Sequence, residues 1–372
     1  MYRQRIATSL PIMTGPAAAL PYLTSDLAGI GGVLRQHDDD FRVEEIPAYE
    51  PDGHGDHVFV RIEKRGLTTP AAAGRMAAAL GVAAHDIGWA GMKDRHAVTR
   101  QTLSFPPPCT PEAVAQLDLP DIRVLEARRH RHKLRTGHLA GNRFVLILRD
   151  VAGDEHGAAE RAQAILDRLA RPPGMPNWFG SQRFGQDNQN AMIGRAVVTG
   201  APLPPGVRKP RGREIRLYVS ALQSELFNEY VRCRMADALF DRVIAGDLMQ
   251  KVATGGMFAS SDPAIDQARL DSGEIVPTGP MYGHKVRLPP AGTPAFEREA
   301  AVLASADLTL EAFARVRKLG MGTRRAMAVR VQNPAVRPVG DRALELSFEL
   351  PAGCYATAVM REIVKGPDSF PG

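Results

Sequence analysis

The stretch from Gly88 to Gln101 places one carboxylate, Asp94, directly between two cations, Lys93 and Arg95. Neighbouring positive charge favours the ionised form of an acid, so we expect Asp94 to be a carboxylate at neutral pH even where it is partly buried. An ionised carboxylate on a turn can attack a sugar carbon or stabilise charge that develops there. The triplet alone favours an exposed turn with weak surface ion pairs, because structural ion pairs are far commoner than catalytic ones.

A longer pattern around this triplet changes the interpretation. Residues 91–101, with the sequence GMKDRHAVTRQ, resemble the signature of the TruD family of tRNA pseudouridine synthases. Four further segments resemble the same family in the same order: residues 40–45 (DFRVEE), 141–144 (GNRF), 177–185 (NWFGSQRFG) and 350–357 (LPAGCYAT). Together the motifs extend over most of the chain, and a chance coincidence of five ordered motifs is not credible.

The resemblance implies an enzyme that isomerises uridine 13 of tRNA, with Asp94 as the essential aspartate. This residue either attacks the sugar C1′ or deprotonates the sugar, and the sequence does not choose between the two. The motifs also imply a uracil pocket lined by Phe41, Asn142, Phe144 and Tyr355. Asn142 can both donate and accept hydrogen bonds at a uracil edge. The aromatic rings offer stacking of about 1–3 kcal/mol per base, although each ring, taken alone, is also consistent with ordinary core packing.

The cations beside Asp94 complete the expected substrate site. Lys93 and Arg95 are interpreted as its electrostatic support, and His96 stays open between phosphate binding and a structural role. The resemblance implies no metal and no organic cofactor. A glycoside-cleaving enzyme with paired carboxylates is disfavoured, because no second acid stands out in the motif regions.

A basic stretch follows the central motif. Arg128, Arg129, Arg131 and Lys133 alternate with histidines, and no acid interrupts them. An extended strand here would present a basic stripe to an RNA phosphate backbone, whereas the ordinary alternative is a solvated face. Residues 202–216 form a second basic segment, interpreted as an RNA-facing loop, and a helix expected at 308–319 carries Arg315, Arg317 and Lys318.

Composition is compatible with this reading. The 372 residues suffice for two domains, and 47 Lys and Arg against 41 Asp and Glu give a net charge of +6, which suits a polyanionic partner without requiring one. Cys109, Cys233 and Cys354 are far apart, which argues against a zinc site or disulfide framework and fits a reducing cytoplasm. No apolar run is long enough to span a membrane. We therefore expect a cytoplasmic monomer whose partner is tRNA.

Short-range signals predict the elements that must position these residues. A threonine cap and a proline begin a helix after Thr68, and Gly81 ends it. A strand is expected at Val98–Phe105, directly after the catalytic motif. Near the C-terminus, Arg342–Leu350 alternates apolar and polar residues as a strand buried on one face does. Further strands are expected at 33–35, 41–46, 57–64 and 143–149, and further helices at 155–169, 217–240 and 355–364.

The break Pro172-Pro173-Gly174 predicts a domain boundary. By resemblance, a second domain is inserted there and the chain later returns to finish the first. We expect a flexible tail at 1–27, a catalytic domain at 28–176 and 320–372, and an inserted TRUD domain at 177–319. The expected fold class is α+β: a pseudouridine synthase core with a mixed or antiparallel sheet flanked by helices and its motifs in permuted order, together with an inserted α/β domain.

Two alternatives keep the same fold. One is an RNA-binding protein that has lost catalysis, which the intact motifs at 93–95 and 141–144 argue against. The other is a pseudouridine synthase that acts on a different RNA. At residues 177–185, Arg183 and two phenylalanines are interpreted as a structural lock in preference to an RNA contact, because aromatic side chains bury well at interfaces.

Overall fold

The computed structural model describes residues 20–366, apart from the side chain of Gln182. These residues divide into two compact units. Unit 1 comprises residues 20–23 and 176–328, and unit 2 comprises residues 24–175 and 329–366. Two short strands, β8 (Met175–Pro176) and β13 (Ala328–Val329), mark the points where the chain passes from one unit to the other.

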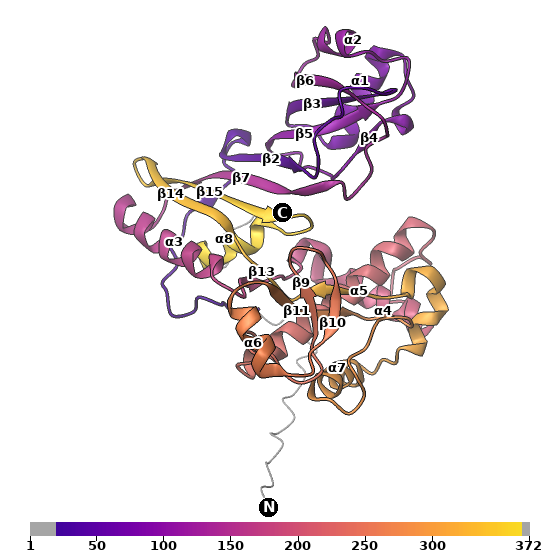
Figure 1. Cartoon of the computed structure of the whole chain (residues 1–372), viewed down its shortest axis with the longest axis vertical. Helices are drawn as coiled ribbons and strands as arrows, with labels where there is room; N and C mark the ends of the chain where they lie inside the picture. Colours follow the sequence, from indigo (N-terminus) through magenta and orange to yellow (C-terminus); the bar gives the residue numbers. More distant parts are fainter. Residues whose placement is uncertain (1–19, 367–372) are drawn as a thin grey trace, which may run out of the picture. The chain divides into compact units, whose positions relative to one another are not determined.

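Unit 2 is organised around one mixed sheet (Figure 1). The pair β2–β5 is parallel, and the other pairs of this sheet are antiparallel. The expected α+β class with a mixed sheet and flanking helices is thereby confirmed. The strands in sheet order, with the two short ones last, are β14 (Gln332–Gly340), β15 (Ala343–Pro351), β7 (Leu139–Arg149), β2 (Phe41–Pro47), β5 (Val98–Phe105), β3 (His57–Arg65), β6 (Ile122–His130), β1 (Val33–Leu34) and β4 (Gly88–Trp89).

Helices pack against this sheet at two places. Helix α1 begins where Thr68 accepts a hydrogen bond from the backbone of Ala71, and it ends at Gly81, whose φ of 68° is left-handed. Its alanines and Met76 share a core with buried side chains of β3 and β5, whereas α3 and α8 lie beside β14 and β15 (Figure 1). The helices of unit 2 are α1 (Thr69–Leu80), α2 (Pro111–Ala115), α3 (Glu155–Ala170) and α8 (Ala356–Val364), with short 3₁₀ helices η1 (Asp38–Asp40) and η2 (Ala84–Asp86).

The two faces of the sheet differ in polarity. Along β2, Phe41, Val43 and Glu45 are buried, whereas Arg42 on the opposite face is exposed. Side chains alternate between the faces of a strand, so one face packs into the core and the other meets solvent. We call the first the buried face. The opposite face carries arginine–carboxylate pairs such as Arg100–Glu63 at 2.9 Å.

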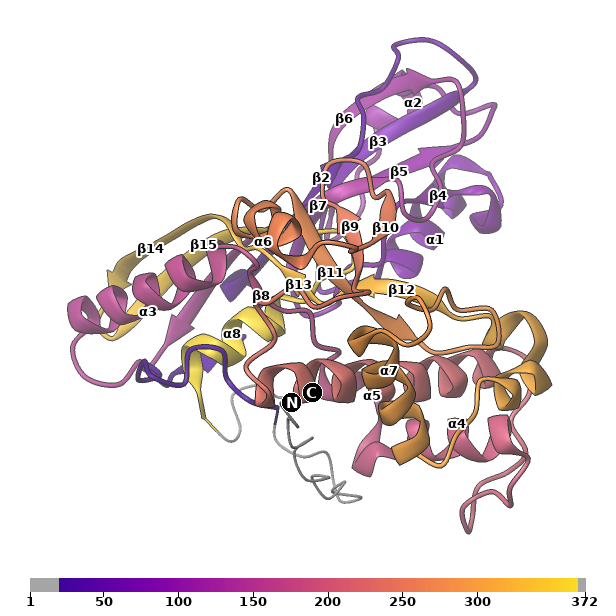
Figure 2. The ribbon, with the colours of Figure 1, turned by 60° about the horizontal axis from the view of Figure 1, so that its bottom comes forward.

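Unit 1 contains a four-stranded sheet and several helices (Figure 2). Buried side chains of α5, among them Leu226, Phe227 and Tyr230, share one core with Trp178 and Phe179. The strands in sheet order are β10 (Met257–Ala259), β9 (Leu248–Lys251), β11 (Ile275–Met281) and β12 (Thr323–Ala326). The helices are α4 (Gln189–Thr199), α5 (Arg213–Ala236), α6 (Pro263–Asp271) and α7 (Pro294–Ser305), with 3₁₀ helices η3 (Ser181–Arg183), η4 (Gln186–Asn188) and η5 (Glu311–Gly320).

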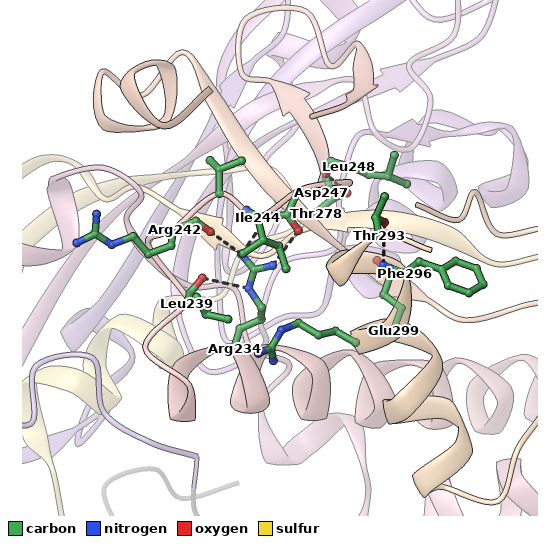
Figure 3. Close-up of polar contacts among 12 residues, drawn as sticks. Arg234, Leu239, Arg242, Ile244, Asp247, Leu248, Thr278, Thr293, Phe296 and Glu299 are labelled. Atoms are coloured by element: carbon green, nitrogen blue, oxygen red, sulfur yellow. Dashed lines mark hydrogen bonds and ion pairs between the residues drawn. The ribbon is translucent and has the colours of Figure 1, made fainter. Parts of the chain in front are cut away.

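A buried ion pair fixes the end of α5 (Figure 3). Arg234 and Asp247 are almost completely buried, and an Nη1–Oδ1 distance of 2.8 Å joins them. The same guanidinium donates to the backbone carbonyls of Leu239 and Arg242. Loss of one partner of such a pair leaves an uncompensated buried charge, so this contact specifies how the segment after α5 packs.

The expected flexible tail is wrong in its last residues. The backbone N–H and the hydroxyl of Thr24 both donate to Glu362, at 3.0 and 2.7 Å, and Lys365 donates to carbonyls at 24 and 27. These buried contacts hold the segment against α8. Residues 1–19 of the predicted tail lie outside the described residues.

The expected return of the chain at residue 320 also differs from the structure, which places it at 328/329. The reason is that β12 pairs with β11 of unit 1, from Thr278↔Ala326 to Met281↔Thr323. The helix predicted at 308–319 is a 3₁₀ helix, η5, interrupted at Arg317, which has a φ of 50°. Within residues 20–366, no helix combines the length and apolar character that crossing a membrane requires.

Candidate active site

Asp94 lies in the loop that connects β4 to β5 in unit 2. Its side chain is 59% exposed, whereas the side chain of Lys93 is 5% exposed. The carboxylate of Asp94 is therefore largely exposed to solvent. The loop turns Lys93 into the protein and Asp94 outward, because neighbouring residues of an extended segment point in opposite directions.

The cation that contacts Asp94 is Arg35. Its Nη2 lies 2.8 Å from Oδ2 of Asp94. Lys93, predicted as electrostatic support for Asp94, makes its ion pair with Glu45, at 2.7 Å. Arg95 is exposed and makes no ion pair within residues 20–366. The carboxylate is therefore held by a residue distant in sequence and not by its two neighbours.

Arg35 is itself held in place. It follows β1 in a left-handed conformation, with a φ of 65°. Its guanidinium lies over the ring of Phe41, with Cζ 3.9 Å from the ring centroid, which is close enough for a cation–π interaction. Arg35 could not be identified from sequence patterns, because no spacing rule connects it to Asp94. Their contact arises when β2 pairs with β5 and β1 pairs with β7.

A second missed residue, Lys64 on β3, holds the backbone of the catalytic loop. Lys64 is fully buried, and its ammonium group donates to the carbonyl oxygens of Asp94, at 2.9 Å, and Leu67. Burial lowers the pKa of Lys64 from 10.5 to about 8, although the charge of Asp94 opposes this change. This hydrogen bond from a charged ammonium group to the main chain restricts the movement of Asp94.

Further buried contacts anchor the loop through Lys93. Its backbone N–H donates to the hydroxyl of Thr69 at 2.9 Å, and that hydroxyl donates to Oε1 of Gln101 at 2.9 Å. The partner of Lys93, Glu45, also accepts from the backbone N–H of Thr102 at 3.2 Å. Lys93 therefore ties the loop to α1, β2 and β5, and the motif positions 93 and 101 act here as anchors of the loop.

The residues of β2 and β7 that are predicted to line a uracil pocket lie on the buried face of the sheet. The strand register pairs Glu45 with Asn142 and Val43 with Phe144, so the predicted residues of β2 and β7 share one face. Phe41 and Phe144 meet edge to face, with ring centroids 6.4 Å apart, and both are buried. Arg35 lies over the ring of Phe41, and little of either ring is exposed to solvent.

The remaining aromatic residue predicted for the pocket is Tyr355. It immediately precedes α8 and follows β15, whose Leu350 pairs with Asn142. In contrast to the two phenylalanines, its side chain is 44% exposed. Among the predicted aromatic residues, Tyr355 therefore offers the most open ring face.

Polar atoms without partners mark the same buried face. Within residues 20–366, Oδ1 of Asn142, Nε2 of Gln101 and Oγ1 of Thr99 are buried and make no hydrogen bond. Gln101 and Asn142 lie on the strands to either side of Glu45. A buried unsatisfied polar group costs about 1–3 kcal/mol. Such groups are rare and call for an explanation, such as a ligand or water that they bind.

The predicted basic stripe does not form. Strand β6 is present but ends at His130, so Arg131 and Lys133 lie in the following loop. On β6, Arg129 and Arg128 project from opposite faces, because they pair with consecutive residues of β3. Arg128 forms an ion pair with Glu126, and Arg131 with Asp52 at 2.8 Å. Lys133 donates to the carbonyl of His85 at 3.1 Å.

The motif at 177–185 is a structural lock within unit 1, as predicted. Phe179 and Phe184 are buried in its core. Asn228 bonds both backbone polar groups of Phe179 at 2.9 Å, and the guanidinium of Arg325 lies 4.2 Å from its ring centroid. In the part of the chain that the structure describes, no group of three or more His, Cys, Asp or Glu side chains is arranged to hold a metal ion.

Comparisons with known proteins agree on one family. The family model described as tRNA pseudouridine synthase D (TruD) matches residues 18–203 and 212–363. The chain is 49% identical over 353 residues to tRNA pseudouridine synthase D of Anaeromyxobacter dehalogenans strain 2CP-1, covering 95% of this chain and 98% of that protein. It is 40% identical over 404 residues to tRNA pseudouridine synthase D of Geobacter metallireducens, covering 93% and 98%.

A solved structure shares the fold. A crystal structure from Methanosarcina mazei, described as tRNA pseudouridine synthase D (TruD), aligns with a TM-score of 0.74 over 93% of this chain and 96% of that chain. The sequence identity is 23%, so this likeness concerns the fold alone.

Proposed function

This chain belongs to the TruD family of tRNA pseudouridine synthases, and on that premise we propose that it isomerises uridine 13 of tRNA to pseudouridine with Asp94 as its catalytic carboxylate. The reaction breaks the bond between C1′ and N1 of the uridine, turns the freed uracil and forms a bond from C1′ to C5. The protein must place an anion at C1′, retain the uracil and keep water out, since hydrolysis would otherwise compete.

The observation that carries this proposal is the contact between Asp94 and Arg35 above Phe41. Arg35 contacts only Oδ2 of the carboxylate, and Oδ1 has no hydrogen-bond partner within residues 20–366. A carboxylate fixed through one oxygen and open at the other can approach a ribose from a constant direction. Such pre-positioning removes an entropic part of the barrier. Attack on C1′ and proton abstraction from the sugar both begin from this geometry.

The remaining site residues would hold the uracil after it leaves its stack. The unpartnered Oδ1 of Asn142 can accept the N3–H of uracil, and its amide can donate to a neighbouring carbonyl. Tyr355, whose ring is partly exposed, would cover the base. Phe41 and Phe144, which are buried, would form the apolar floor that excludes water. Lys93 contributes by anchoring the loop through Glu45.

The test maps pseudouridine in bulk tRNA incubated with and without the protein. We expect modification at position 13, and we expect Asp94→Asn to abolish it while tRNA affinity stays nearly unchanged. Asp86→Asn is a matched control, because Asp86 is an exposed aspartate that precedes the loop. Residual turnover by Asp94→Asn would refute the role of this residue. Binding without modification would favour an RNA-binding protein, and modification elsewhere would favour a different RNA substrate.

A further inference from the structure

Several arginines of unit 1 form ion pairs with carboxylates. Arg232 pairs with Glu229 at 2.6 Å, and Arg269 with Asp266 at 2.8 Å. Ion pairs also hold Arg195, Arg242 and Arg298. At these arginines the positive charge is therefore balanced locally.

Among the described residues, a group of cations in unit 1 has no such carboxylate partners. Its members come from the loop between α4 and α5, from the first turn of α5 and from η5. All are exposed, and none makes an ion pair within residues 20–366. We call this group the cationic patch, and its members are Lys209, Arg211, Arg213, Arg216, Arg315, Arg317 and Lys318.

The two contributing segments lie together. Helix η5 packs against α4 and α5, and Figure 2 shows η5, in orange, at the same end of unit 1 as the loop that follows α4. Gly200 ends α4 and begins that loop. The guanidinium of Arg315 lies against it, because a Cβ at Gly200 would meet Nη2 of Arg315 at 2.5 Å. Arg213 and Arg216 are three residues apart on α5 and so share one exposed side.

Without a bound anion, the cationic patch destabilises the folded protein. Glu214 and Glu311 are the only acids in residues 208–216 and 311–320, and Glu214 is already paired with Arg208. Like charges held close together repel. In addition, Arg317 has a φ of 50° and a ψ of −125°, a conformation that costs a residue other than glycine about 1–3 kcal/mol. Unpaired charge and backbone strain in one place are features of a binding surface.

We propose that the cationic patch binds the phosphate backbone of the tRNA at nucleotides away from the target uridine. The proposal rests on the proposed function, which supplies the RNA. Guanidinium groups match phosphate oxygens through two parallel hydrogen bonds, and most members of the patch are arginines. Backbone contacts fix the orientation of a nucleic acid without reading its sequence. The patch lies in unit 1 and Asp94 in unit 2, and the contribution that we assign to the patch is to affinity.

The experiment compares two variants of the full chain with equal loss of charge. The patch variant carries Arg213→Gln, Arg216→Gln, Arg317→Gln and Lys318→Gln. The control variant carries Arg232→Gln, Arg242→Gln, Arg269→Gln and Arg298→Gln, which change arginines that have acidic partners in the same unit. Circular dichroism and thermal melting check that both variants are folded.

The first measurement is the dissociation constant for full-length tRNA over a series of salt concentrations. With the patch variant, we expect weaker binding by roughly tenfold or more. We also expect a log–log salt slope smaller by about 3.6, because each of the four lost phosphate contacts removes about 0.9 from that slope. We expect the control variant to bind like the wild type. We also expect an RNA hairpin that contains only the target stem to bind both variants and the wild type alike, and kcat at saturating tRNA to be unchanged.

Three results would overturn the proposal. They are an unchanged salt slope in the patch variant, an equal loss in the control variant, and an equal loss of affinity for the short hairpin. Failure of the proposed function is recognised separately, because the binding measurements need no turnover. Wild-type protein that makes no pseudouridine but binds tRNA through the patch would refute the function and support the patch. Normal turnover with unaltered binding by the patch variant would refute the patch alone.

Discussion

At the scale of single residues, Arg35 has the role that the sequence pattern assigned to Lys93 and Arg95, which is to support the carboxylate of Asp94. Lys93 and Arg95 flank the carboxylate in sequence, but Arg35 contacts it in space. Arg35 is also restrained by the ring of Phe41. A charged partner fixed in this way needs little reorganisation during the reaction, and electrostatic preorganisation of this kind is often the largest contribution to catalysis.

We predict that Arg35→Met lowers kcat by about 10²–10³-fold, the usual cost of a lost preorganised contact, with little change in tRNA affinity. Arg35→Lys keeps the charge but not the planar fork, so it should restore only part of the rate. Single-turnover kinetics at saturating enzyme compare the rates of Arg35→Met and Arg35→Lys with the rate of the wild type. Arg42→Met is the control, since Arg42 lies on the opposite face of the sheet. A near-normal rate for Arg35→Met would contradict this role.

Lys64 gives a prediction about pH. Its pKa in the folded protein is about 8, against 10.5 in the unfolded chain. Between these values the unfolded chain binds more protons than the folded protein, so this residue makes folding more favourable as the pH rises from about 8 to 10.5. Below about pH 8 both states are protonated, and the cost of burying the charge is fully present.

The measurement compares the melting temperature of the wild type with that of Lys64→Met at several pH values. We expect the wild type to gain stability relative to the variant between pH 8 and 10. The subtraction removes the titration of other lysines, tyrosines and cysteines that both proteins share. A difference that stays constant over this range would show that the buried Lys64 does not titrate there.

At the scale of elements, Thr69 connects α1 to the catalytic loop. Thr69→Val keeps the shape of the side chain but leaves the backbone N–H of Lys93 and the amide oxygen of Gln101 without partners. Each orphaned group costs about 1–3 kcal/mol. We predict faster hydrogen exchange at residues 91–97 and a lower kcat, with KM for tRNA nearly unchanged.

Thr68→Ala is the matched control for this prediction. It removes the N-terminal cap of α1, which costs about 1 kcal/mol of stability, but Thr68 makes no hydrogen bond to the catalytic loop within residues 20–366. It should therefore lower the melting temperature without changing exchange at residues 91–97. If both variants exchange alike in the loop, the effect of Thr69→Val comes from α1 as a whole and not from the anchor.

The elements also show what the sequence could predict. Helix α1 was predictable because its threonine, proline and glycine signals are local. The face shared by Phe41, Asn142 and Phe144 follows from alternation once β2 pairs with β7. The contacts of Arg35 and of Lys93 were not predictable, because they depend on which strands pair. The prediction of a basic stripe was wrong for a related reason. The basic stretch continues past the end of β6, and Asp52, which pairs with Arg131, comes from a distant segment.

At the scale of the whole molecule, the two units have separate hydrophobic cores. One surrounds α5 in unit 1, and another lies between α1 and the strands β3 and β5 in unit 2. The chain passes between the units at 175/176 and at 328/329. Units built around their own cores can unfold as separate cooperative steps, in which case one melting temperature does not describe the molecule.

We therefore predict two calorimetric transitions, each sensitive to changes in its own unit. Arg234→Met leaves Asp247 buried without its partner, which costs about 3–5 kcal/mol, and it should lower only the transition of unit 1. Thr68→Ala should lower only the transition of unit 2. Arg269→Gln, which removes a surface pair in unit 1, should shift little, because such pairs contribute about 0–1 kcal/mol. A single transition that moves with both Arg234→Met and Thr68→Ala would mean that the units unfold together. The cationic patch could then not be altered independently of the site around Asp94.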